Sequence, residues 1–357
     1  MGDVLLSLAA ILVSVFVLAV VTDKFFIPSL DEISRRLKLS DEVAGASLMA
    51  IGSSAPELAI ALMALFTAGG AHSDVGIGTI VGSAVFNILV ITGISAVVAG
   101  GLHIHIFAVG RDIAYYLISI LYLGLVFFDG HVSLIEAVLG LVGYVVYMGL
   151  LIVLKDPEAD DEQAPQNASQ AASESGQVAG WHHLEALVET VLRRVTGPPD
   201  KNFVWAFAVS IALIVALSYV LVEATIVFSA GLGIPPVIVA LTLLAAGTSA
   251  PDLMASVDVA REGRGGMAVA NAVGSNTFDL LVGLALPWTI ALSLLGLRGI
   301  DVATGDLWTS IGILVLTTLA LFRFLWTERG LSRREGWVLL LLYAVFVVYT
   351  LASGTAI

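Results

Sequence analysis

Residues 52–57 of the chain read GSSAPE, and residues 247–252 read GTSAPD. A second motif follows each of them: residues 82–87 read GSAVFN, and residues 274–279 read GSNTFD. The two motifs return in the same order and at nearly the same spacing, which indicates two copies of one structural unit. Each motif carries hydroxyl side chains and ends in an acid or an amide.

The composition around these motifs is that of a membrane protein. Of the 357 residues, 58% are hydrophobic and 13% are charged, whereas about one quarter of the residues in a soluble domain are charged. A soluble enzyme and a disordered protein are therefore excluded as first interpretations. The net charge of -13 argues against a nucleic-acid partner, which requires clustered Lys and Arg. The absence of cysteine excludes disulfides, thiolate metal sites and cysteine nucleophiles.

A membrane helix needs about 20 mostly apolar residues. We predict ten such spans, at residues 4–21, 43–66, 75–99, 107–128, 132–154, 203–228, 234–260, 267–295, 307–325 and 337–354. Lys and Arg mark the cytoplasmic side of a membrane protein. If the N-terminus is outside, every Lys and Arg except Arg298 falls on that side. We therefore expect a multi-pass protein of the cell membrane (plasma or inner) with both termini outside.

The same orientation makes the two motif copies antiparallel in the membrane. The span at 43–66 then runs outward and the span at 234–260 runs inward. Inverted repeats with a site at their interface are typical of secondary transporters. The predicted fold class is an all-α membrane protein with ten transmembrane helices in two inverted-topology five-helix repeats.

The domain organisation follows from this repeat. We expect a first half at residues 1–154, with its motif region at 43–99, and a second half at 201–357, with its motif region at 234–295. An acidic cytoplasmic linker, residues 155–200, separates them. Its first part is rich in Ala, Ser, Gln and Glu, which bury too little apolar area to order a segment, and residues 183–195 have the pattern of a short amphipathic helix. We expect a solvated tether rather than a regulatory calcium sensor, because no EF-hand spacing is present.

Three acids fall inside apolar spans: Glu57, Asp252 and Asp279. A charged side chain at the centre of a membrane helix costs about 2.5–3.5 kcal/mol, so these acids need a cation, a partner or a proton. Hydroxyl residues three or four positions earlier share a helix face with each acid or amide. The hydroxyl residues are Ser53, Ser54, Ser83, Thr248, Ser249 and Ser275, and the amide is that of Asn87. Carboxylate, amide and hydroxyl oxygens together suit calcium or sodium rather than a transition metal.

Mid-span prolines add backbone oxygens to this set. Pro56 and Pro251 each lack an N–H and displace the carbonyl four residues earlier. We therefore expect unpaired carbonyls near residues 50–52 and 245–247, which are tolerated at membrane depth only inside protein or around a cavity. Glycines of the motifs should let helices approach closely; they are Gly52, Gly82, Gly247 and Gly274.

At these motifs the chain resembles the cation/calcium exchanger superfamily, and within it the potassium-dependent sodium/calcium exchanger branch. The resemblance covers residues 40–155 and 205–295. It implies antiport of sodium against calcium by alternating access, with the ions as substrates, no cofactor and no enzymatic activity. An Asp at the position of Asp279 is associated with potassium cotransport in that family, so potassium is a candidate third ion. The expected partners are Ca²⁺, Na⁺, K⁺ or H⁺ and the lipid bilayer, with no obligate protein partner.

The resemblance also implies the roles of the site residues. Glu57 and Asp252 would be the central carboxylate ligands, and Asn87 and Asp279 their partners on the following helices. The remaining ligands would be Ser53, Ser54, Ser83, Thr248, Ser249 and Ser275, with the backbone carbonyls of Ala50 and Ala245.

Other functions stay open at this point. The same carboxylates could carry protons in a calcium/proton antiporter, because burial favours the neutral form of a carboxyl group. Asp252 and Asp279 could be the acids of an intramembrane aspartyl protease, but that leaves Glu57 and the repeat unexplained. The sequence does not exclude a passive channel.

Overall fold

The computed structural model describes residues 2–37, 50–67, 72–154, 182–294, 299–302, 305–328 and 330–354. Within these residues, eight helices are long and apolar enough to cross a membrane. Counting the pair Pro236–Thr248 and Ala250–Arg261, which is bent by 46°, as one span gives nine. The prediction of an all-α membrane protein is confirmed. The count of ten stays a prediction, since residues 43–49 of the predicted span at 43–66 lie outside the described residues.

The elements of the first half are α1 (Gly2–Val21), η1 (Thr22–Phe26), α2 (Ile27–Leu37), α4 (Ala50–Ser53), α5 (Ala55–Phe66), α6 (Ser73–Phe86), η4 (Asn87–Ile91), α7 (Thr92–Ala99), β1 (Gly101–His103), α8 (Ile106–Val126), β2 (His131–Val132) and α9 (Leu134–Val153), where η marks a π-helical turn. The linker contains α12 (His182–Thr196). The second half contains α13 (Phe203–Leu232), α14 (Pro236–Val239), η5 (Ala240–Leu244), α15 (Ala245–Thr248), α16 (Ala250–Arg261), α17 (Gly265–Phe278), η6 (Asp279–Gly283), α18 (Ala285–Leu294), β3 (Ile300–Asp301), α19 (Gly305–Glu328), β4 (Gly330–Ser332) and α20 (Arg333–Gly354).

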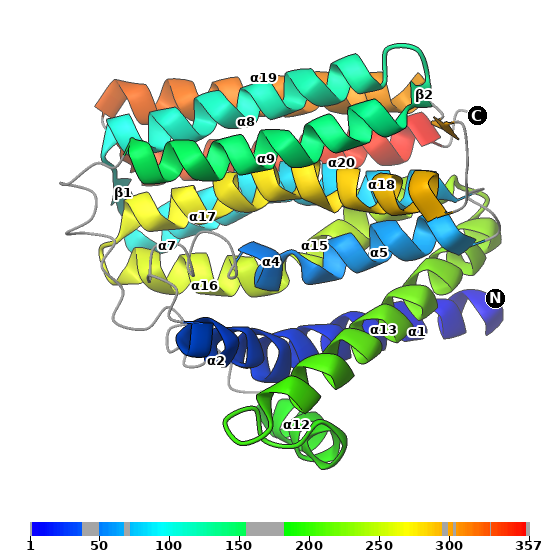
Figure 1. Ribbon diagram of the computed structural model, residues 1–357. Helices are drawn as coiled ribbons and strands as arrows, with labels where there is room; N and C mark the ends of the chain where they lie inside the picture. The colour runs from blue at the N-terminus through cyan, green and yellow to red at the C-terminus, as the bar shows by residue number, and fades with distance from the viewer. Residues whose placement is uncertain are drawn as a thin grey trace.

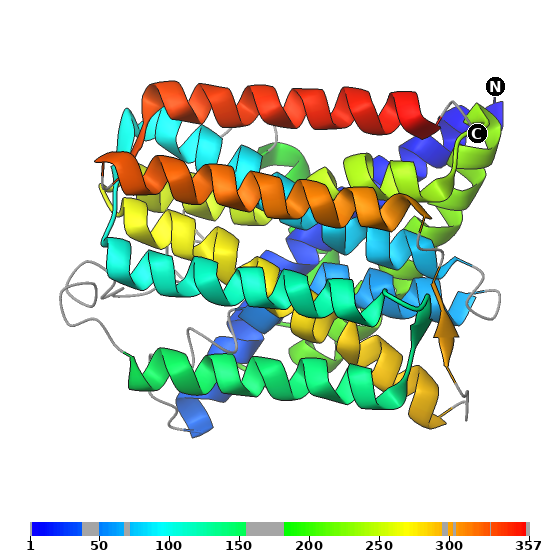
Figure 2. The ribbon, with the colours of Figure 1, turned by 90° about the horizontal axis from the view of Figure 1, so that it is seen from above.

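The helices lie side by side in layers (Figures 1 and 2). Helices α8, α9, α19 and α20 form one outer layer, and α1 packs along α13 on the opposite side of the bundle. The spans Ser73–Ala99 and Gly265–Leu294 are the two most buried. The second motif of each copy therefore lies in the centre of the molecule, while the first motif lies on helices that pack against it, α5 on α6 and α16 on α17.

Two short antiparallel strand pairs join the halves. Strand β1 pairs with β4, with Leu102 opposite Leu331, and β2 pairs with β3, with Val132 opposite Ile300. β1 and β2 lie at opposite ends of the bundle (Figure 1). Each pair connects a loop after the third span of one half with a loop before the fifth span of the other. In the order of spans, β1 of the first half corresponds to β3 of the second, and β2 corresponds to β4. Exchanging the halves therefore turns the pair β1–β4 into the pair β3–β2.

The fifth span of each half also begins in the same way. Ser133 and Glu136 form a capping box before α9, in which Ser133 N donates to Glu136 Oε2 at 2.8 Å and Glu136 N donates to Ser133 Oγ at 3.3 Å. Ser332 and Glu335 repeat both contacts, at 2.8 and 3.3 Å, at the start of α20. Because β2 and β4 lie at opposite ends, α9 and α20 run in opposite directions (Figures 1 and 2). The strand pairs and the matched helix starts support the predicted inverted repeat. That the two complete halves are related in this way stays a prediction.

The motif glycines differ in how closely they approach a neighbour. A Cβ on Gly82 would lie 2.7 Å from the backbone carbon atoms of Leu241, so α6 and η5 touch through their backbones here. Gly52 and Gly247 face side chains, Ile27 and Val15, at 2.9 Å. The expectation for Gly274 is wrong: the nearest atom to its added Cβ is Tyr147 Oη at 3.9 Å, because a side chain rather than a backbone covers this position.

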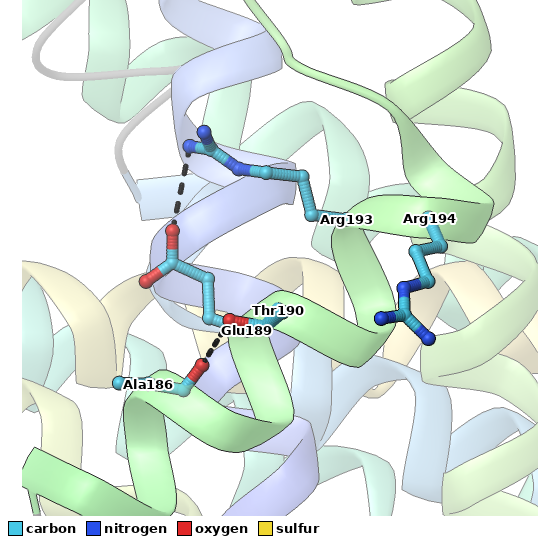
Figure 3. A pocket seen from close by; sticks show the side chains of 5 residues that line it. All are labelled: Ala186, Glu189, Thr190, Arg193 and Arg194. Carbon is cyan, nitrogen blue, oxygen red and sulfur yellow. Dashed lines mark hydrogen bonds and ion pairs between the residues drawn. The ribbon is translucent and has the colours of Figure 1, made fainter.

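The amphipathic helix predicted at residues 183–195 is α12. Lys24 Nζ, on η1, lies 3.0 Å from Glu185 Oε1 and ties this helix to the first span. The outer side of α12 carries an open groove of about 360 Å³ lined by Ala186, Glu189, Thr190, Arg193 and Arg194 (Figure 3). Within it Arg193 pairs with Glu189 at 3.4 Å. This surface groove contains none of the predicted ion ligands.

Candidate ion-binding site

A break in each first-motif helix positions the central acids. Pro56 and Pro251 stand in the first turn of α5 and α16, and the residues before those helices, Ser54 and Ser249, share one backbone conformation (φ −91°, ψ 7° and φ −84°, ψ 1°). A proline cannot continue the hydrogen bonding of the preceding helix, so each span is interrupted at its serine. Glu57 therefore lies in the first turn after the break. Asp252 occupies the same place in the second half.

The second motif of each half ends at the start of a π-helical turn. Asn87 is the first residue of η4, and Asp279 is the first residue of η6. Such turns are rare and occur frequently at functional sites. Two matched turns, each opening with the polar residue of its motif, place Asn87 and Asp279 in the most buried spans.

The four polar groups are shielded from solvent, and three of them are incompletely hydrogen-bonded by the described residues. The exposed fraction is 2% for Glu57, 6% for Asp252, 1% for Asp279 and 0% for Asn87. Within the described part of the chain, Glu57 Oε2, Asn87 Oδ1 and both carboxylate oxygens of Asp279 are buried without a hydrogen-bond partner. Burying a polar group without a partner is costly. These oxygens are therefore available to a cation.

Serine hydroxyls from the two halves meet around these groups. Ser54 Oγ lies 3.1 Å from Ser275 Oγ, and Ser83 Oγ lies 2.7 Å from Ser249 Oγ. Ser54 corresponds to Ser249 and Ser83 to Ser275 in the repeated motifs, so the two contacts are equivalent under exchange of the halves. Ser275 Oγ also donates to Asp252 Oδ2 at 3.2 Å. The motifs thus converge at one interface between the halves.

Other predicted ligands occupy the helix ends next to this interface. Ala50 begins α4 and Ser53, half-buried, ends it. Thr248 Oγ1 donates to Leu244 O at 3.2 Å, within its own span. The expectation that the carbonyl of Ala245 is unpaired is wrong, since α15 continues far enough for Ser249 N to donate to it at 3.1 Å. A carbonyl has two acceptor lone pairs, so its role as a ligand stays a prediction.

The acids are near one another without forming a cluster of carboxylates. Helix α5, which carries Glu57, packs against η6, which carries Asp279. Ser275 Oγ contacts both Asp252 Oδ2 and Ser54 Oγ, at 3.2 and 3.1 Å. Yet among the described residues no group of three or more His, Asp or Glu side chains could by itself hold a metal ion. A cation here would need the amide, hydroxyl or backbone oxygens as well as the carboxylates.

One polar residue beside this site, Asn276, is not among the ligands predicted from the sequence. Asn276 is fully buried on α17, accepts from Asn87 Nδ2 at 2.9 Å and donates from its Nδ2 to Ala84 O at 3.0 Å. The signal was present in the motif: Asn276 stands where the first copy has Ala84, and a buried amide in a membrane helix needs partners.

Comparison with known proteins agrees with this architecture. A profile of the family described as sodium/calcium exchanger protein matches residues 7–153 and 202–352. Sodium/potassium/calcium exchanger 4 of Homo sapiens is 27% identical over 98% of this chain and 81% of its own length. Sodium/potassium/calcium exchanger 5 of Homo sapiens is 31% identical, over 81% of this chain and 71% of its own length.

A solved structure shares the fold. The sodium-calcium exchanger NCX_Mj, from crystals soaked with Na⁺ and Sr²⁺, matches 97% of this chain and 99% of its own, with a TM-score of 0.56 and 23% identity. At that identity the likeness concerns the fold alone. The profile match, which spans most of both halves, carries the assignment: the chain belongs to the sodium/calcium exchanger protein family.

Proposed function

We propose that this protein is a secondary antiporter that exchanges Na⁺ for Ca²⁺ across the membrane by alternating access. The observation that carries the proposal is the set of buried oxygens of Glu57, Asn87 and Asp279 at an interface between the two halves, for which the described residues supply no hydrogen-bond partner. Oxygen-only donors of this kind suit hard cations. A site built from both halves can be opened to one side or the other when the halves move relative to each other.

The proposed ligand set has a centre and a periphery. Glu57 and Asp252 supply the central charge, and Asn87 and Asp279 face them from the next helix of each half. Two acids match the charge of one Ca²⁺, and the same oxygens can hold sodium ions instead. Hydroxyl and backbone oxygens complete the shell; they are those of Ser53, Ser54, Ser83, Thr248, Ser249 and Ser275 and the carbonyls of Ala50 and Ala245.

Potassium is the proposed third ion. The relatives at 27–31% identity are named sodium/potassium/calcium exchangers, and Asp279 breaks the match with Asn87 by adding a charge to the second half. Both carboxylate oxygens of Asp279 are without a hydrogen-bond partner among the described residues, so they are available as ligands for a further monovalent cation.

The test is calcium flux into proteoliposomes under an imposed sodium gradient, with and without potassium. We expect calcium to move against the sodium gradient and to reverse when the gradient is reversed. Calcium movement that ignores sodium and follows a proton gradient would replace the proposal with a calcium/proton antiporter. Movement that only follows the calcium gradient would indicate a passive channel.

We further expect sodium and calcium to compete for overlapping positions. Like charges repel strongly in a poorly solvated cavity, so full loading with both ions is unfavourable. Calcium titrations by calorimetry should give an apparent Kd that rises with sodium concentration. A calcium Kd independent of sodium, with both ions bound at saturation, would contradict a shared site.

A further inference from the structure

We propose that Asn276 is a positioning residue that fixes the amide of Asn87, so that the oxygen and not the NH₂ group of Asn87 faces the transported cation. The need arises from chemistry: an amide presents an acceptor at one end and two donors at the other. A flipped Asn87 would direct its donors at a cation and repel it. A ligand amide in this protein therefore requires a group that sets its orientation.

The hydrogen bonds around Asn276 set that orientation step by step. The carbonyl of Ala84 can only accept, so the atom of Asn276 that contacts it at 3.0 Å is the donor Nδ2. The other end of this amide, Oδ1, can only accept and faces Asn87. Asn87 must therefore present Nδ2 to Asn276, at 2.9 Å. The backbone of Ala84 thus determines, through two amides, that Asn87 Oδ1 points away from Asn276.

The released oxygen is the one that a cation needs. Asn87 Oδ1 is buried and has no hydrogen-bond partner within the described part of the chain. Asn87 and Asn276 both have an exposed fraction of 0%, so bulk solvent does not reorient either amide. The contact also joins the first half to the second, since η4 carries Asn87 and α17 carries Asn276.

The second half shows why one such residue is enough. In the repeated motif Ala84 corresponds to Asn276, and Asn87 corresponds to Asp279. The two oxygens of a carboxylate are equivalent, so Asp279 offers an acceptor to a cation in either orientation. Asp279 needs no orienting partner, and the position that would supply one holds Ala84. The copies differ at three positions, and two of these differences, Ala84 against Asn276 and Asn87 against Asp279, therefore belong together.

The proposal rests on the proposed function, because it assumes that Asn87 is a ligand, and a double-mutant cycle tests it. In the purified protein, Asn276→Ala should raise two quantities about tenfold: the Ca²⁺ Kd measured by calorimetry, and the calcium concentration at half-maximal sodium-driven transport. Tenfold is the usual effect of losing one polar contact to a charge, here the contact of Asn87 Oδ1 with the cation. The maximal rate should stay within about twofold. Thr277→Val is the matched control, since Thr277 is equally buried on α17 and its hydroxyl donates within its own helix, to Val273 O at 3.0 Å. This variant should leave both values unchanged.

The second arm of the cycle separates positioning from packing. In an Asn87→Ala background, which itself raises the Kd about tenfold, Asn276→Ala should add less than twofold. In an Asn87→Asp background it should cause no further loss, because a carboxylate needs no orientation. If Asn276→Ala does not fold, Asn276→Leu fills a similar volume, cannot accept from Asn87 and replaces it in the cycle.

The outcomes that overturn the proposal are distinct. If Asn87→Ala weakens calcium binding and Asn276→Ala does not, the positioning role is wrong while the ligand role of Asn87 stands. If the two substitutions are fully additive, Asn276 acts through packing and the proposal is again wrong. If Asn87→Ala leaves the Kd unchanged, Asn87 is not a ligand and the proposal falls with that assignment. Antiport itself fails only if wild-type calcium flux ignores the sodium gradient.

Discussion

At the scale of single residues, Glu57 and Asp252 occupy matched places in the two halves, and we expect Glu57→Gln and Asp252→Asn each to abolish sodium-driven calcium transport. Removing one charge from a desolvated ionic contact costs about 2–5 kcal/mol, or roughly 30-fold or more in affinity. The fold should persist, because each amide keeps the size of the acid and an oxygen that accepts, for example from Ser275. Flux and thermal unfolding measured on the same preparation check both expectations.

A matched control for these variants lies outside the site. Glu136 caps α9 by accepting from Ser133 N at 2.8 Å, and glutamine can serve in the same capping box. Glu136→Gln should therefore transport calcium at close to the wild-type rate. Wild-type transport by Glu57→Gln or Asp252→Asn would remove that acid from the site.

Asp279 is the residue at which the two halves differ in charge. We expect calcium transport by the wild type to be stimulated by potassium and transport by Asp279→Asn to be indifferent to it, because the variant restores the amide found at Asn87 and removes the added charge. Flux at fixed sodium and calcium gradients, with potassium varied, measures this. A wild type that ignores potassium, with a variant whose transport depends less on pH, would instead mean that Asp279 carries a proton. A variant that binds no calcium would make Asp279 an indispensable calcium ligand.

At the scale of elements, the contact of α6 with η5 sets the spacing of the core. We expect Gly82→Ala to destabilise the protein by about 1–3 kcal/mol, the usual cost of overpacking, because its new Cβ would lie 2.7 Å from backbone atoms of Leu241. Gly274→Ala is the matched control at the same motif position, where the added Cβ meets only Tyr147 Oη at 3.9 Å. Thermal unfolding in one detergent compares the two. Equal losses of stability would contradict a backbone contact specific to Gly82.

The same elements show what the sequence can and cannot predict. The prolines predict the interrupted helices around Glu57 and Asp252, since a missing N–H is a property of the residue itself. The linker helix at residues 183–195 is predicted by its amphipathic period. The π-helical turns that begin at Asn87 and Asp279 have no such local signal, because a π turn depends on packing against neighbouring helices.

Errors in the predicted site have two origins, packing against distant segments and the local length of a helix. Gly274 was expected to permit a close approach and does not, because the neighbour at that position is a side chain. The carbonyl of Ala245 was expected to be free and accepts from Ser249 N, because the length of α15 is not fixed by Pro251 alone. Asn276 was passed over because its partners, Asn87 and the carbonyl of Ala84, lie 189 and 192 positions away in the chain. For Gly274 and Asn276 the deciding atom belongs to a distant segment, whereas for Ala245 it belongs to the next turn of the same span.

At the scale of the whole molecule, the contacts between the halves constrain the topology. Strand pair β1–β4 places residues 101 and 332 at one end of the bundle, and β2–β3 places residues 132 and 300 together. The sidedness predicted from Lys and Arg assigns each pair to a single face, the first cytoplasmic and the second outside. An odd number of additional spans between β1 and β4 would put these two strands on opposite faces of the membrane, which their pairing forbids.

The absence of cysteine makes this topology directly testable. Asp129, which accepts from His131 N next to β2, and Thr190, on the exposed side of α12, are separated by one predicted crossing, α9. We expect a membrane-impermeant maleimide to label an Asp129→Cys variant in intact cells, and to label a Thr190→Cys variant only after the membrane is permeabilised. The cysteine-free parent reports any background. The reverse pattern would mean that the N-terminus is cytoplasmic. Labelling of both variants in intact cells would mean that α9 does not cross the membrane, and the five-helix halves would then be wrong.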